Sequence, residues 1–475
     1  NNKSKSYRRL VFDEICANFL TLSENRKIIK KIKQPKQFSN KHADILIKKL
    51  PFKLTESQKF VLEEINLDLL SKNRMFRIIQ GDVGSGKTIV SLISIMNVIK
   101  SGFQCAFMSP TEILAKQHYE LAKNIFKDQK FRIEFLTGKT EIKKRRNIMN
   151  NLINGKIELL IGTHALFQKK IDFKKLGMVV IDEQHKFGVK QRSELAKKGG
   201  NDCDVLLMSA TPIPRTMMMA LYGDMDISKI TEKPSIRKKI ITLSKPEKKI
   251  KELWSFLKSQ IKQNNQVFWV CPLIDESKFL DYSSAKNKYD IINKIFPGKV
   301  GLIHGSLNKD DKDEVLRKFL RKEIDILVST TVIEVGIDFP NATVIIIENA
   351  NKFGLSQLHQ LRGRVGRGNK ESSCILMFKS SLTENAKKRL SILKKSNDGF
   401  EISEEDMKLR GFGDILGFKQ SGIKNFKLAD PIHNHNLFIL AEKEIKRIEN
   451  EKEDIGRFKP LIKLYDRADI INDIA

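Results

Sequence analysis

The segment Gly81–Thr88 constrains the fold of this chain more than any other stretch. It reads Gly-Asp-Val-Gly-Ser-Gly-Lys-Thr and fits the phosphate-binding pattern G-x-x-x-x-G-K-[ST]. Its glycines let backbone N–H groups turn inward around phosphate oxygens, while Lys87 reaches the terminal phosphates and the Thr88 hydroxyl can hold Mg²⁺. The pattern predicts a nucleoside triphosphatase. The expected phosphate-binding residues are Gly81, Asp82, Val83, Gly84, Ser85, Gly86, Lys87 and Thr88.

The residues on either side of this loop supply the context that the motif needs. Met75–Gln80 is a short apolar run typical of a buried strand, and Ile89–Lys100 has the periodicity of a helix. A helix that begins at the loop completes an anion site, because its first N–H groups point at the phosphates. Strand, loop and helix in this order make a chance match improbable.

Composition indicates a large protein that attracts polyanions. The chain has 475 residues, enough for two to four domains, and a formal net charge of +30. Nucleic acid is the usual partner of such a surplus. Codon composition offers a competing explanation for part of the excess, because Lys, Ile and Asn are abundant throughout.

Cysteine usage and hydropathy indicate a cytoplasmic protein. The cysteines are scattered without a C-x-x-C pair, as expected for reduced, buried thiols. No apolar run reaches membrane-spanning length and no signal peptide is evident, so we expect no membrane partner. The chain begins Asn-Asn-Lys, which leads us to expect a fragment of a longer protein.

Short apolar runs alternate with helical stretches in two successive blocks, which predicts two α/β lobes with parallel sheets. The first block holds the phosphate loop, and a basic connector, Lys233–Lys239, precedes the second. The expected strands are Cys105–Met108, Ile133–Leu136, Leu159–Ile161, Met178–Ile181 and Val205–Met208, then Gln266–Cys271, Val300–His304, Ile324–Ser329, Val344–Ile347 and Cys374–Phe378.

The pattern divides the chain into four expected parts. Residues 1–50 are a helical, Lys-rich linker, and residues 51–232 form the ATP-binding lobe. Residues 233–381 form the second lobe, and residues 382–475 turn helical and polar. The expected fold class is α/β: two tandem P-loop lobes of RecA type followed by a helical C-terminal segment.

A pair of carboxylates ends one apolar strand of the first lobe. Val179–Ile181 is followed by Asp182, Glu183, Gln184 and His185. Asp182 is placed to hold Mg²⁺ and Glu183 to orient the attacking water, with His185 beside the nucleotide. Ser209-Ala210-Thr211 follows a later strand, where it can sense the γ-phosphate.

The second lobe contributes a glycine-spaced arginine motif, Gln360–Arg367. Arg364 and Arg367 can present guanidinium groups to a phosphate and stabilise phosphoryl transfer, with Gln360 nearby. Upstream, Gly336 and Asp338 lie at an expected strand-to-loop junction. A basic patch on nucleic-acid phosphates is the alternative interpretation. In order, these motifs resemble those of superfamily 2 helicases.

Other strand ends are candidates for nucleic-acid contact. Hydroxyls and helix N-termini there can bind phosphates without reading bases. The candidates are Thr111, Gly138, Thr163, His164 and Thr331.

Residues before the phosphate loop are candidates for selecting ATP. Gln58 can pair with the adenine edge while Phe52 stacks on the ring, although Phe52 is equally well explained as a core residue.

The chain closely resembles the RecG family of bacterial ATP-dependent DNA helicases. The resemblance runs from about residue 8 to about residue 430 and is carried by Gln80–Thr88, Asp182–Val189, Ser209–Thr216 and Phe353–Gly368. The transcription-repair coupling translocase shares the framework and is the alternative family. Ser85, the Asp182–His185 sequence and Val335 before Gly336 follow the RecG pattern.

The resemblance implies action on branched or duplex DNA, such as Holliday junctions and stalled forks, by a bacterial, nucleoid-associated monomer. Single-stranded-DNA-binding protein is a further implied partner. Arg389, Arg410 and Gln420 match the polar residues of the family's translocation element, which couples lobe closure to movement. The usual Arg-Gly-Pro-Gly is Arg410-Gly411-Phe412-Gly413 here, which puts the coupling geometry in doubt.

The family also carries an N-terminal wedge domain, of which residues 1–50 match only the linker that follows it. We therefore expect a motor that hydrolyses ATP on branched DNA and unwinds it poorly. A catalytically silent DNA-binding scaffold is the remaining alternative.

Overall fold

The structure is a computed structural model of the whole chain, and it describes most of the residues. The described ranges are 4–30, 32–168, 170–183, 200–210, 225–234, 238–272, 278–330, 339–366, 368, 370–379, 382–410, 426–430, 433–451 and 454–465.

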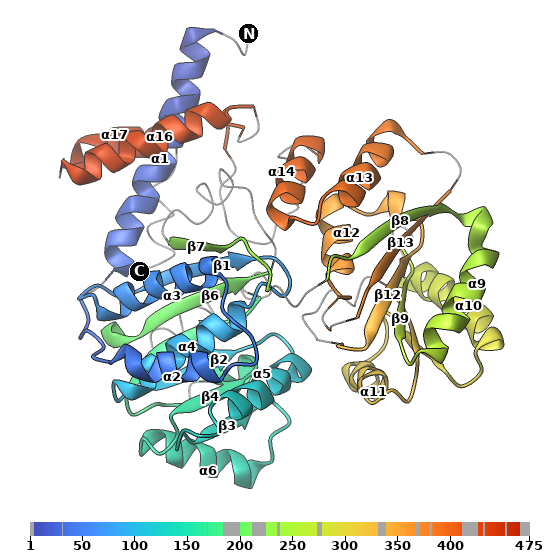
Figure 1. The fold of residues 1–475 in the computed structure, drawn as a ribbon. Coiled ribbons are helices and arrows are strands. Elements are labelled where there is room, and N and C mark those ends of the chain that lie inside the picture. Colours follow the sequence, from blue (N-terminus) through green and yellow to red (C-terminus); the bar gives the residue numbers. More distant parts are fainter. Residues whose placement is uncertain are drawn as a thin grey trace. The chain divides into compact units, whose positions relative to one another are not determined.

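The chain divides into two compact units (Figure 1). The first unit comprises Asn1–Gly81, Gly86–Glu232 and Met407–Ala475, and the second comprises Asp82–Ser85 and Lys233–Asp406. Four residues of the phosphate loop are thus grouped with the second unit. The four-part division expected from the sequence remains a prediction about domains.

A seven-stranded sheet forms the centre of the first unit, in the order β3-β4-β2-β5-β6-β1-β7. All its pairings are parallel. The strands expected from the sequence are confirmed, and β7 is an addition at one edge. Their bounds are β1 Phe76–Gly81, β2 Gln104–Met108, β3 Ile133–Leu136, β4 Leu159–Gly162, β5 Leu176–Ile181, β6 Asp204–Ser209 and β7 Asp226–Ile230.

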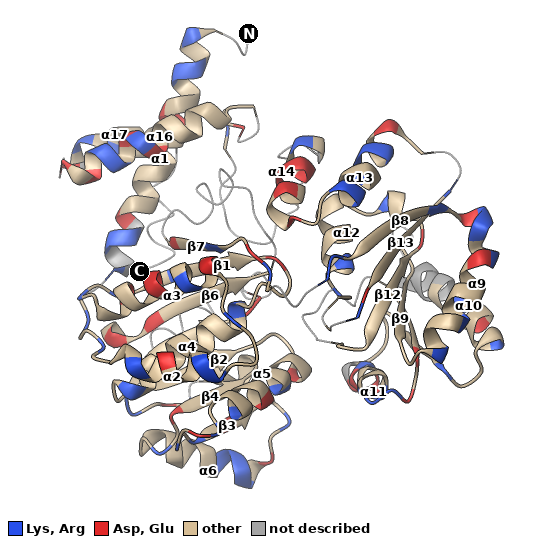
Figure 2. Ribbon diagram, viewed as in Figure 1, with Lys and Arg blue, Asp and Glu red and all other residues tan. Residues whose placement is uncertain are grey.

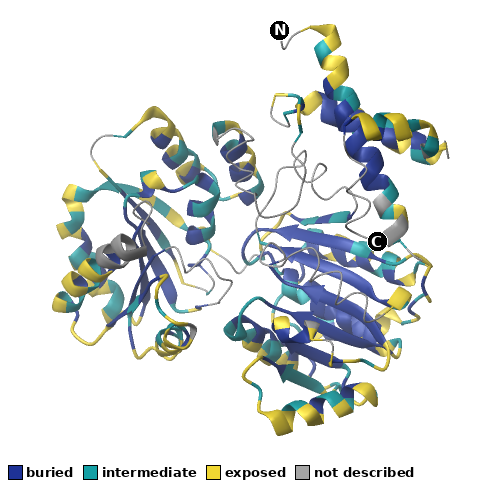
Figure 3. Ribbon diagram, turned by 180° about the vertical axis from the view of Figure 1, so that it is seen from behind, coloured by how far each residue is buried: buried dark blue, intermediate teal, exposed yellow. Residues whose placement is uncertain are grey.

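Consecutive strand residues enter two different hydrophobic cores, because side chains alternate between the faces of a sheet. Ile79 and Val180 pack on one face with α3 and α4 residues, whereas Ile78 and Val179 pack on the other. This burial on both faces explains the nearly continuous apolar runs (Figure 3). The helices are α2 Asn40–Lys49, α3 Glu56–Leu70, α4 Lys87–Lys100, α5 Glu112–Ile125 and α6 Ile142–Ile153.

The second unit contains a six-stranded parallel sheet in the order β10-β11-β9-β12-β13-β8. It confirms the predicted second α/β lobe and adds β8 at one edge. The strands are β8 Ile241–Pro246, β9 Gln266–Val270, β10 Val300–Ile303, β11 Ile326–Ser329, β12 Ala342–Ile347 and β13 Ser373–Phe378.

Helices also cover the second sheet. Leu253 and Leu257 of α9 pack with Ile292 of α10 on the face that carries Trp269. On the other face, Phe268 contacts Phe319 and Phe339. The helices of this unit are α9 Ile250–Lys262, α10 Lys278–Ile295, α11 Lys309–Leu320, α12 Leu355–Arg362 and α13 Glu384–Lys395, and α14 Gly399–Arg410 begins in it.

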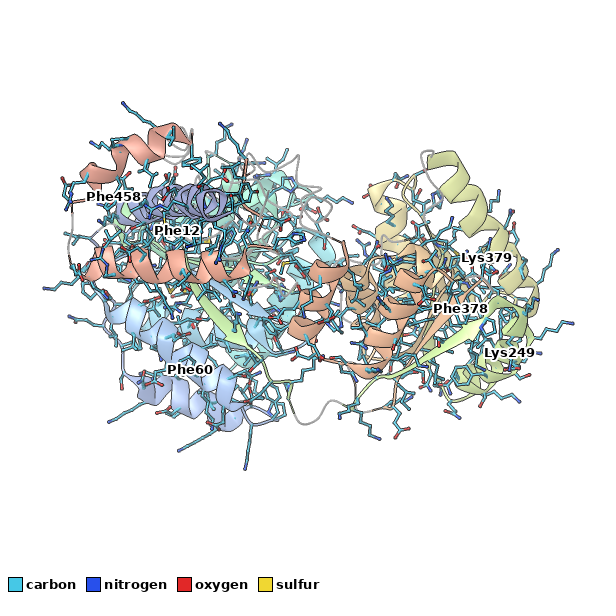
Figure 4. The ribbon with its side chains drawn as sticks, turned by 90° about the horizontal axis from the view of Figure 1, so that it is seen from above. Phe12, Phe60, Lys249, Phe378, Lys379 and Phe458 are labelled. Atoms are coloured by element: carbon cyan, nitrogen blue, oxygen red, sulfur yellow. The ribbon has the colours of Figure 1, made fainter. Side chains whose placement is uncertain are left out.

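The two ends of the chain pack together within the first unit. Helix α1, Lys5–Ile29, lies against α16, His435–Asn450, and α17, Lys459–Leu464. Figure 4 labels Phe12 of α1 and Phe458, which precedes α17, and both pack on the same apolar cluster. Within the described ranges, every helix is too short or too polar to span a lipid bilayer.

The segment between α1 and α2 is bound to the end of α3 and to the residues that follow it. The Lys33 N–H donates to the Lys72 carbonyl at 2.8 Å, and the Lys36 N–H donates to the Leu69 carbonyl at 3.0 Å. Both lysine side chains are buried. This connection is therefore part of the folded first unit rather than a free tether.

Candidate nucleotide and nucleic-acid site

The phosphate loop has the backbone that its glycines allow. Gly84 and Gly86 have φ angles of 76° and 89°, in the left-handed region where a side chain is disfavoured. Gly86 is the N-cap of α4, so the helix begins directly after the loop. The Lys87 ammonium donates to the Gly81 carbonyl at 2.7 Å, which holds it across the loop. The loop thus has the form of an anion cradle.

Gln58 lies directly against this loop. A Cβ added at Gly86 would come within 2.3 Å of the Gln58 Nε2 atom, so the Gln58 amide occupies the space that Gly86 leaves open. Its Oε1 atom accepts the Thr55 N–H at 2.9 Å in a capping box at the start of α3. Phe52 packs against the core, in line with the simpler of its two interpretations. Adenine recognition by either residue stays a prediction.

The expected carboxylate pair ends strand β5. Asp182 and Glu183 are both 8% exposed. Glu183 has a φ of 49°, which is uncommon for a residue other than glycine and typical of functional sites. The Glu183 N–H donates to Asp182 Oδ1 at 2.9 Å, so the two residues form a tight turn at the strand end.

His118 orients Asp182, and sequence reasoning missed it. Its Nε2 atom lies 2.9 Å from Asp182 Oδ2, and its ring packs on Phe107 with centroids 4.7 Å apart. The sequence feature that pointed to it is the spacing of His118, four residues from both Leu114 and Ala122, on the apolar face of α5. A lone histidine on such a face is usually a core residue, so the sequence pattern alone could not identify its partner.

Sheet topology brings the nucleotide candidates to one edge. Strand β1 pairs with β6, and β6 pairs with β5, all parallel. The phosphate loop, Ser209 and Asp182 therefore follow neighbouring strands at the same carboxyl edge, within roughly 10 Å for two strand spacings. Ligands of open α/β sheets bind at this edge.

The same edge continues into the nucleic-acid candidates. Strands β2, β4 and β3 follow one another there. Ser109 directly follows β2, and Thr163 directly follows β4. The hydroxyl oxygens of both residues are buried and have no hydrogen-bond partner among the described residues. The Thr111 hydroxyl accepts the Leu114 N–H at 3.3 Å and caps α5. Gly138 faces open space among the described residues, and His164 is exposed.

In the second unit, the Asp82 carboxylate contacts one histidine side chain and one lysine side chain. Its Oδ1 lies 2.7 Å from His359 Nε2 of α12, and Oδ2 lies 2.5 Å from the Lys233 ammonium. Burial alone raises the pKa of the Asp82 carboxyl, but the His359 hydrogen bond and the Lys233 charge outweigh it and hold that pKa well below its ordinary value. Lys233 and His359 are further residues that sequence reasoning did not single out.

The arginine motif begins on the same helix. Gln360 is partly exposed on α12, and Arg364 is buried just after it. The Arg362 guanidinium donates to the carbonyls of Leu393 and Ser396 at 2.6 and 2.9 Å, so this arginine holds α12 against the end of α13. A Cβ on Gly363 would lie 3.1 Å from Val83 Cβ, and glycine thus permits close packing against a loop residue.

Arg389 of α13 makes contacts inside the second unit. Its guanidinium donates to the carbonyls of Phe353 and Asn351 at 2.7 and 3.0 Å, and it therefore anchors the segment before α12. A role in coupling remains a prediction.

Other candidates lie outside the described residues. They are His185, Thr331, Gly336, Asp338, Arg367, Gln420 and the side chain of Arg410.

Family models match most of the chain in consecutive segments. A model described as DEAD/DEAH box helicase matches residues 55–220, and one described as helicase conserved C-terminal domain matches residues 248–369. Together with the two parallel-sheet units, these matches define a two-lobed helicase core of superfamily 2.

A third model, described as ATP-dependent DNA helicase RecG, domain 3, C-terminal, matches residues 396–463. The RecG helicase of Bacillus subtilis (strain 168) is 46% identical over 441 residues, or 92% of this chain and 64% of the relative. That of Thermotoga maritima is 45% identical over 450 residues, or 94% and 57%. The chain belongs to the RecG family.

Solved structures agree with this assignment. A structure of RecG bound to a three-way DNA junction matches with a TM-score of 0.77 at 42% identity, over 91% of this chain and 57% of that one. The helicase Lhr of Mycobacterium smegmatis has a TM-score of 0.53 at 16% identity, covering 75% and 50%, and supports the fold alone. The chain spans between 57% and 64% of the length of the RecG relatives described here.

Proposed function

We propose that this chain is the ATP-driven motor of a DNA helicase that acts on branched DNA in recombination and repair. The carrying observation is the common carboxyl edge, where the phosphate loop and the Asp182–Glu183 pair follow strands of one parallel sheet. Membership of the RecG family, and the junction bound by a relative, support branched DNA as the substrate.

In this proposal Lys87 and the loop amides bind the phosphates of ATP, and Glu183 orients the attacking water. The Thr88 hydroxyl and the Asp182 carboxylate are oxygen donors of the kind that Mg²⁺ prefers. When bound, Mg²⁺ neutralises phosphate charge. In such sites one or two protein oxygens and the substrate phosphates usually hold the ion.

The remaining sequence motifs supply the other roles. Arg364 and Arg367 stabilise charge during phosphoryl transfer, while Gly336, Asp338, His185 and Gln360 contact the nucleotide. Arg389, Arg410 and Gln420 transmit the movement of the lobes to DNA. The sequence motifs support these assignments.

The first-lobe strand ends bind the DNA backbone in this proposal. Among the described residues, the Thr163 hydroxyl has no hydrogen-bond partner and a Cβ at Gly138 meets nothing, which supports this role. Thr111 and His164 are further first-lobe candidates for backbone contact, and Thr331 is a candidate from the second lobe. We further propose a monomer in the bacterial cytoplasm, associated with the nucleoid and with single-stranded-DNA-binding protein.

The test is phosphate release by the purified chain with and without a three-way DNA junction. We expect DNA to stimulate hydrolysis, and Lys87→Ala to abolish it because the terminal phosphates lose their cation. Lys100→Ala removes the same charge from the exposed end of the same helix and leaves the rate unchanged. DNA-stimulated hydrolysis that survives Lys87→Ala contradicts the assignment of the loop.

A junction-binding measurement and a co-purification experiment separate the alternatives. A chain that binds the junction without hydrolysing ATP is the silent scaffold. Co-purification with RNA polymerase points instead to the transcription-repair coupling class.

A further inference from the structure

Helix α6 carries an unusual concentration of positive charge at its first turn. Its residues Lys143, Lys144, Arg145 and Arg146 are consecutive, and α6 contains no acidic residue (Figure 2). Lys143, Lys144 and Arg146 are exposed. The N-cap, Glu141, makes no side-chain cap bond. Cations at a helix N-terminus are unfavourable because they face the positive end of the helix dipole.

Other charge-rich helices of this chain neutralise their cations internally. Lys446 of α16 pairs with Glu442 at 2.8 Å, and Lys318 of α11 pairs with Glu314 at 2.9 Å. In the part of the chain that the structure describes, Lys143, Lys144 and Arg146 have no carboxylate within 4.0 Å. The charge on α6 is therefore available to an external anion.

One side-chain contact and the short turn that leads from β3 into α6 place this basic turn near the proposed nucleic-acid edge. The Arg145 guanidinium donates to Gln168 Oε1, just after the short helix η1, His164–Phe167. Before α6, the Thr137 N–H donates to Thr140 Oγ1 at 2.9 Å in the turn that ends β3. The basic turn is thus held next to the segments that end β3 and β4.

Its position excludes the nucleotide as the anion. Strand β3 is the outer strand of the sheet, five pairings from β1, which leads into the phosphate loop. At about 4.8 Å per strand this separation is roughly 24 Å. The ligand is therefore an extended polyanion.

The chemistry favours duplex DNA over a single strand. Residues 137–153 contain no aromatic side chain, whereas proteins that bind single strands stack the bases on aromatic rings. Lysine and arginine without aromatics provide contacts to the phosphate backbone. We propose that Lys143, Lys144 and Arg146 form a second DNA contact, which binds the phosphate backbone of duplex DNA at the outer end of the strand-end track.

This inference rests on the proposed function and deepens it. The test compares the full chain with the triple variant Lys143→Gln, Lys144→Gln, Arg146→Gln, by fluorescence anisotropy on a blunt duplex over a series of salt concentrations. A plot of log K against log salt has a negative slope, and each lost phosphate contact makes that slope shallower by about 0.9. We therefore expect the magnitude of the slope to fall by up to ~2.7 in the triple variant. A single-stranded oligonucleotide should be affected less.

Two further variants control for charge and for structure. The variant Lys41→Gln, Lys48→Gln, Lys72→Gln removes the same charge from exposed positions of the first unit and should keep the parent slope. The variant Lys143→Arg, Lys144→Arg, Arg146→Lys keeps the charge of α6 and should also show the parent's salt slope.

Equal slopes for the parent and the α6 triple Gln variant overturn the inference while leaving the proposed function intact. Polyglutamate binding that depends on these cations, without any effect on duplex binding, assigns the surface to an acidic protein and also overturns it. A parent that binds the duplex but shows no DNA-stimulated ATP hydrolysis contradicts the proposed function alone.

Discussion

The Lys33 ammonium donates to both carboxylate oxygens of Asp204, at 2.7 and 2.8 Å, and neither side chain is exposed to solvent. Lys36 approaches the same carboxylate at 2.9 Å and is equally buried. Asp204 Oδ1 also accepts the Met75 N–H at 2.7 Å. One carboxylate at the start of β6 thus fixes both the chain segment after α1 and the residue that precedes β1.

Asp204→Asn should destabilise the first unit strongly. The substitution leaves two buried ammonium groups without a counter-charge, and breaking such a pair costs about 3–5 kcal/mol. Lys33→Met leaves the Lys36–Asp204 pair intact and should cost roughly 1–2 kcal/mol. Native-state hydrogen exchange of the β6 amides measures both. Equal losses would mean that the carboxylate does not organise this cluster.

Lys33 should make stability depend on alkaline pH. Burial lowers its pKa below 10.5 in the folded protein, because the ammonium loses its water, and Asp204 only partly restores it. Between that lowered pKa and 10.5 the unfolded chain binds more protons, so stability rises with pH, by at most about 1.4 kcal/mol per unit.

Buried thiols have the opposite effect. Burial raises the pKa of Cys203 to about 12, so stability falls with pH above 9.0 as the unfolded thiol ionises. The parent and Lys33→Met share these thiols, and the difference between their pH profiles therefore isolates Lys33. The free energy of unfolding of Lys33→Met should lack the rising component, and parallel profiles would contradict the assignment.

Glu14→Gln should loosen the C-terminal segment from α1. The buried Glu14 carboxylate accepts the N–H groups of Lys427, Leu428 and Ala429 at 2.5, 2.8 and 2.8 Å. The Gln side chain would turn its NH₂ group toward some of these N–H donors. We expect the local free energy of unfolding to fall by about 1.5–3 kcal/mol. Hydrogen exchange of residues 427–429 should accelerate about 10- to 100-fold.

The neighbouring residue provides a matched control. Asp13→Asn breaks the pair with Arg9, whose side chain is 73% exposed, and should leave exchange at residues 427–429 within about twofold. Equal acceleration in both variants would show that α1 itself has been perturbed.

Gly162→Ala should disrupt the outer strands of the first sheet. The added Cβ would lie 2.0 Å from the Leu136 carbonyl oxygen, so β3 and β4 could not keep their spacing. We expect a loss of about 3 kcal/mol or more. A Cβ at Gly138 meets nothing within 4 Å among the described residues, and Gly138→Ala should stay within about 0.5 kcal/mol. Thermal unfolding of the two variants tests the contrast.

Sequence periodicity predicted the central strands well because they are buried on both faces. Met178–Ile181 and Val205–Met208 are continuous apolar runs, and both lie inside the first sheet. The edge strands β7 and β8 were not predicted. In β8 the first four residues alternate between exposed and partly buried, and no residue is fully buried. Its apolar pattern is therefore too weak to distinguish it from a connecting segment.

The candidate site was predictable wherever local sequence determines local geometry. The phosphate loop needs glycines at fixed positions, and the carboxylate pair follows an apolar strand, so both are legible without a fold. His118 and His359 were missed because their partners, Asp182 and Asp82, lie 64 and 277 residues away in the chain. Nothing in a short pattern encodes such pairings.

The sequence by itself determined the two α/β lobes, the phosphate loop and the likeness to RecG, because these depend on hydrophobic period and on residues close together in the chain. Tertiary structure alone decided that α1 packs with α16 and that Lys33 and Lys36 share Asp204. It also placed the basic turn of α6 beside the outer strand end. These relationships arise when burial brings distant groups together, and a buried charge must then find its partner wherever the fold supplies one.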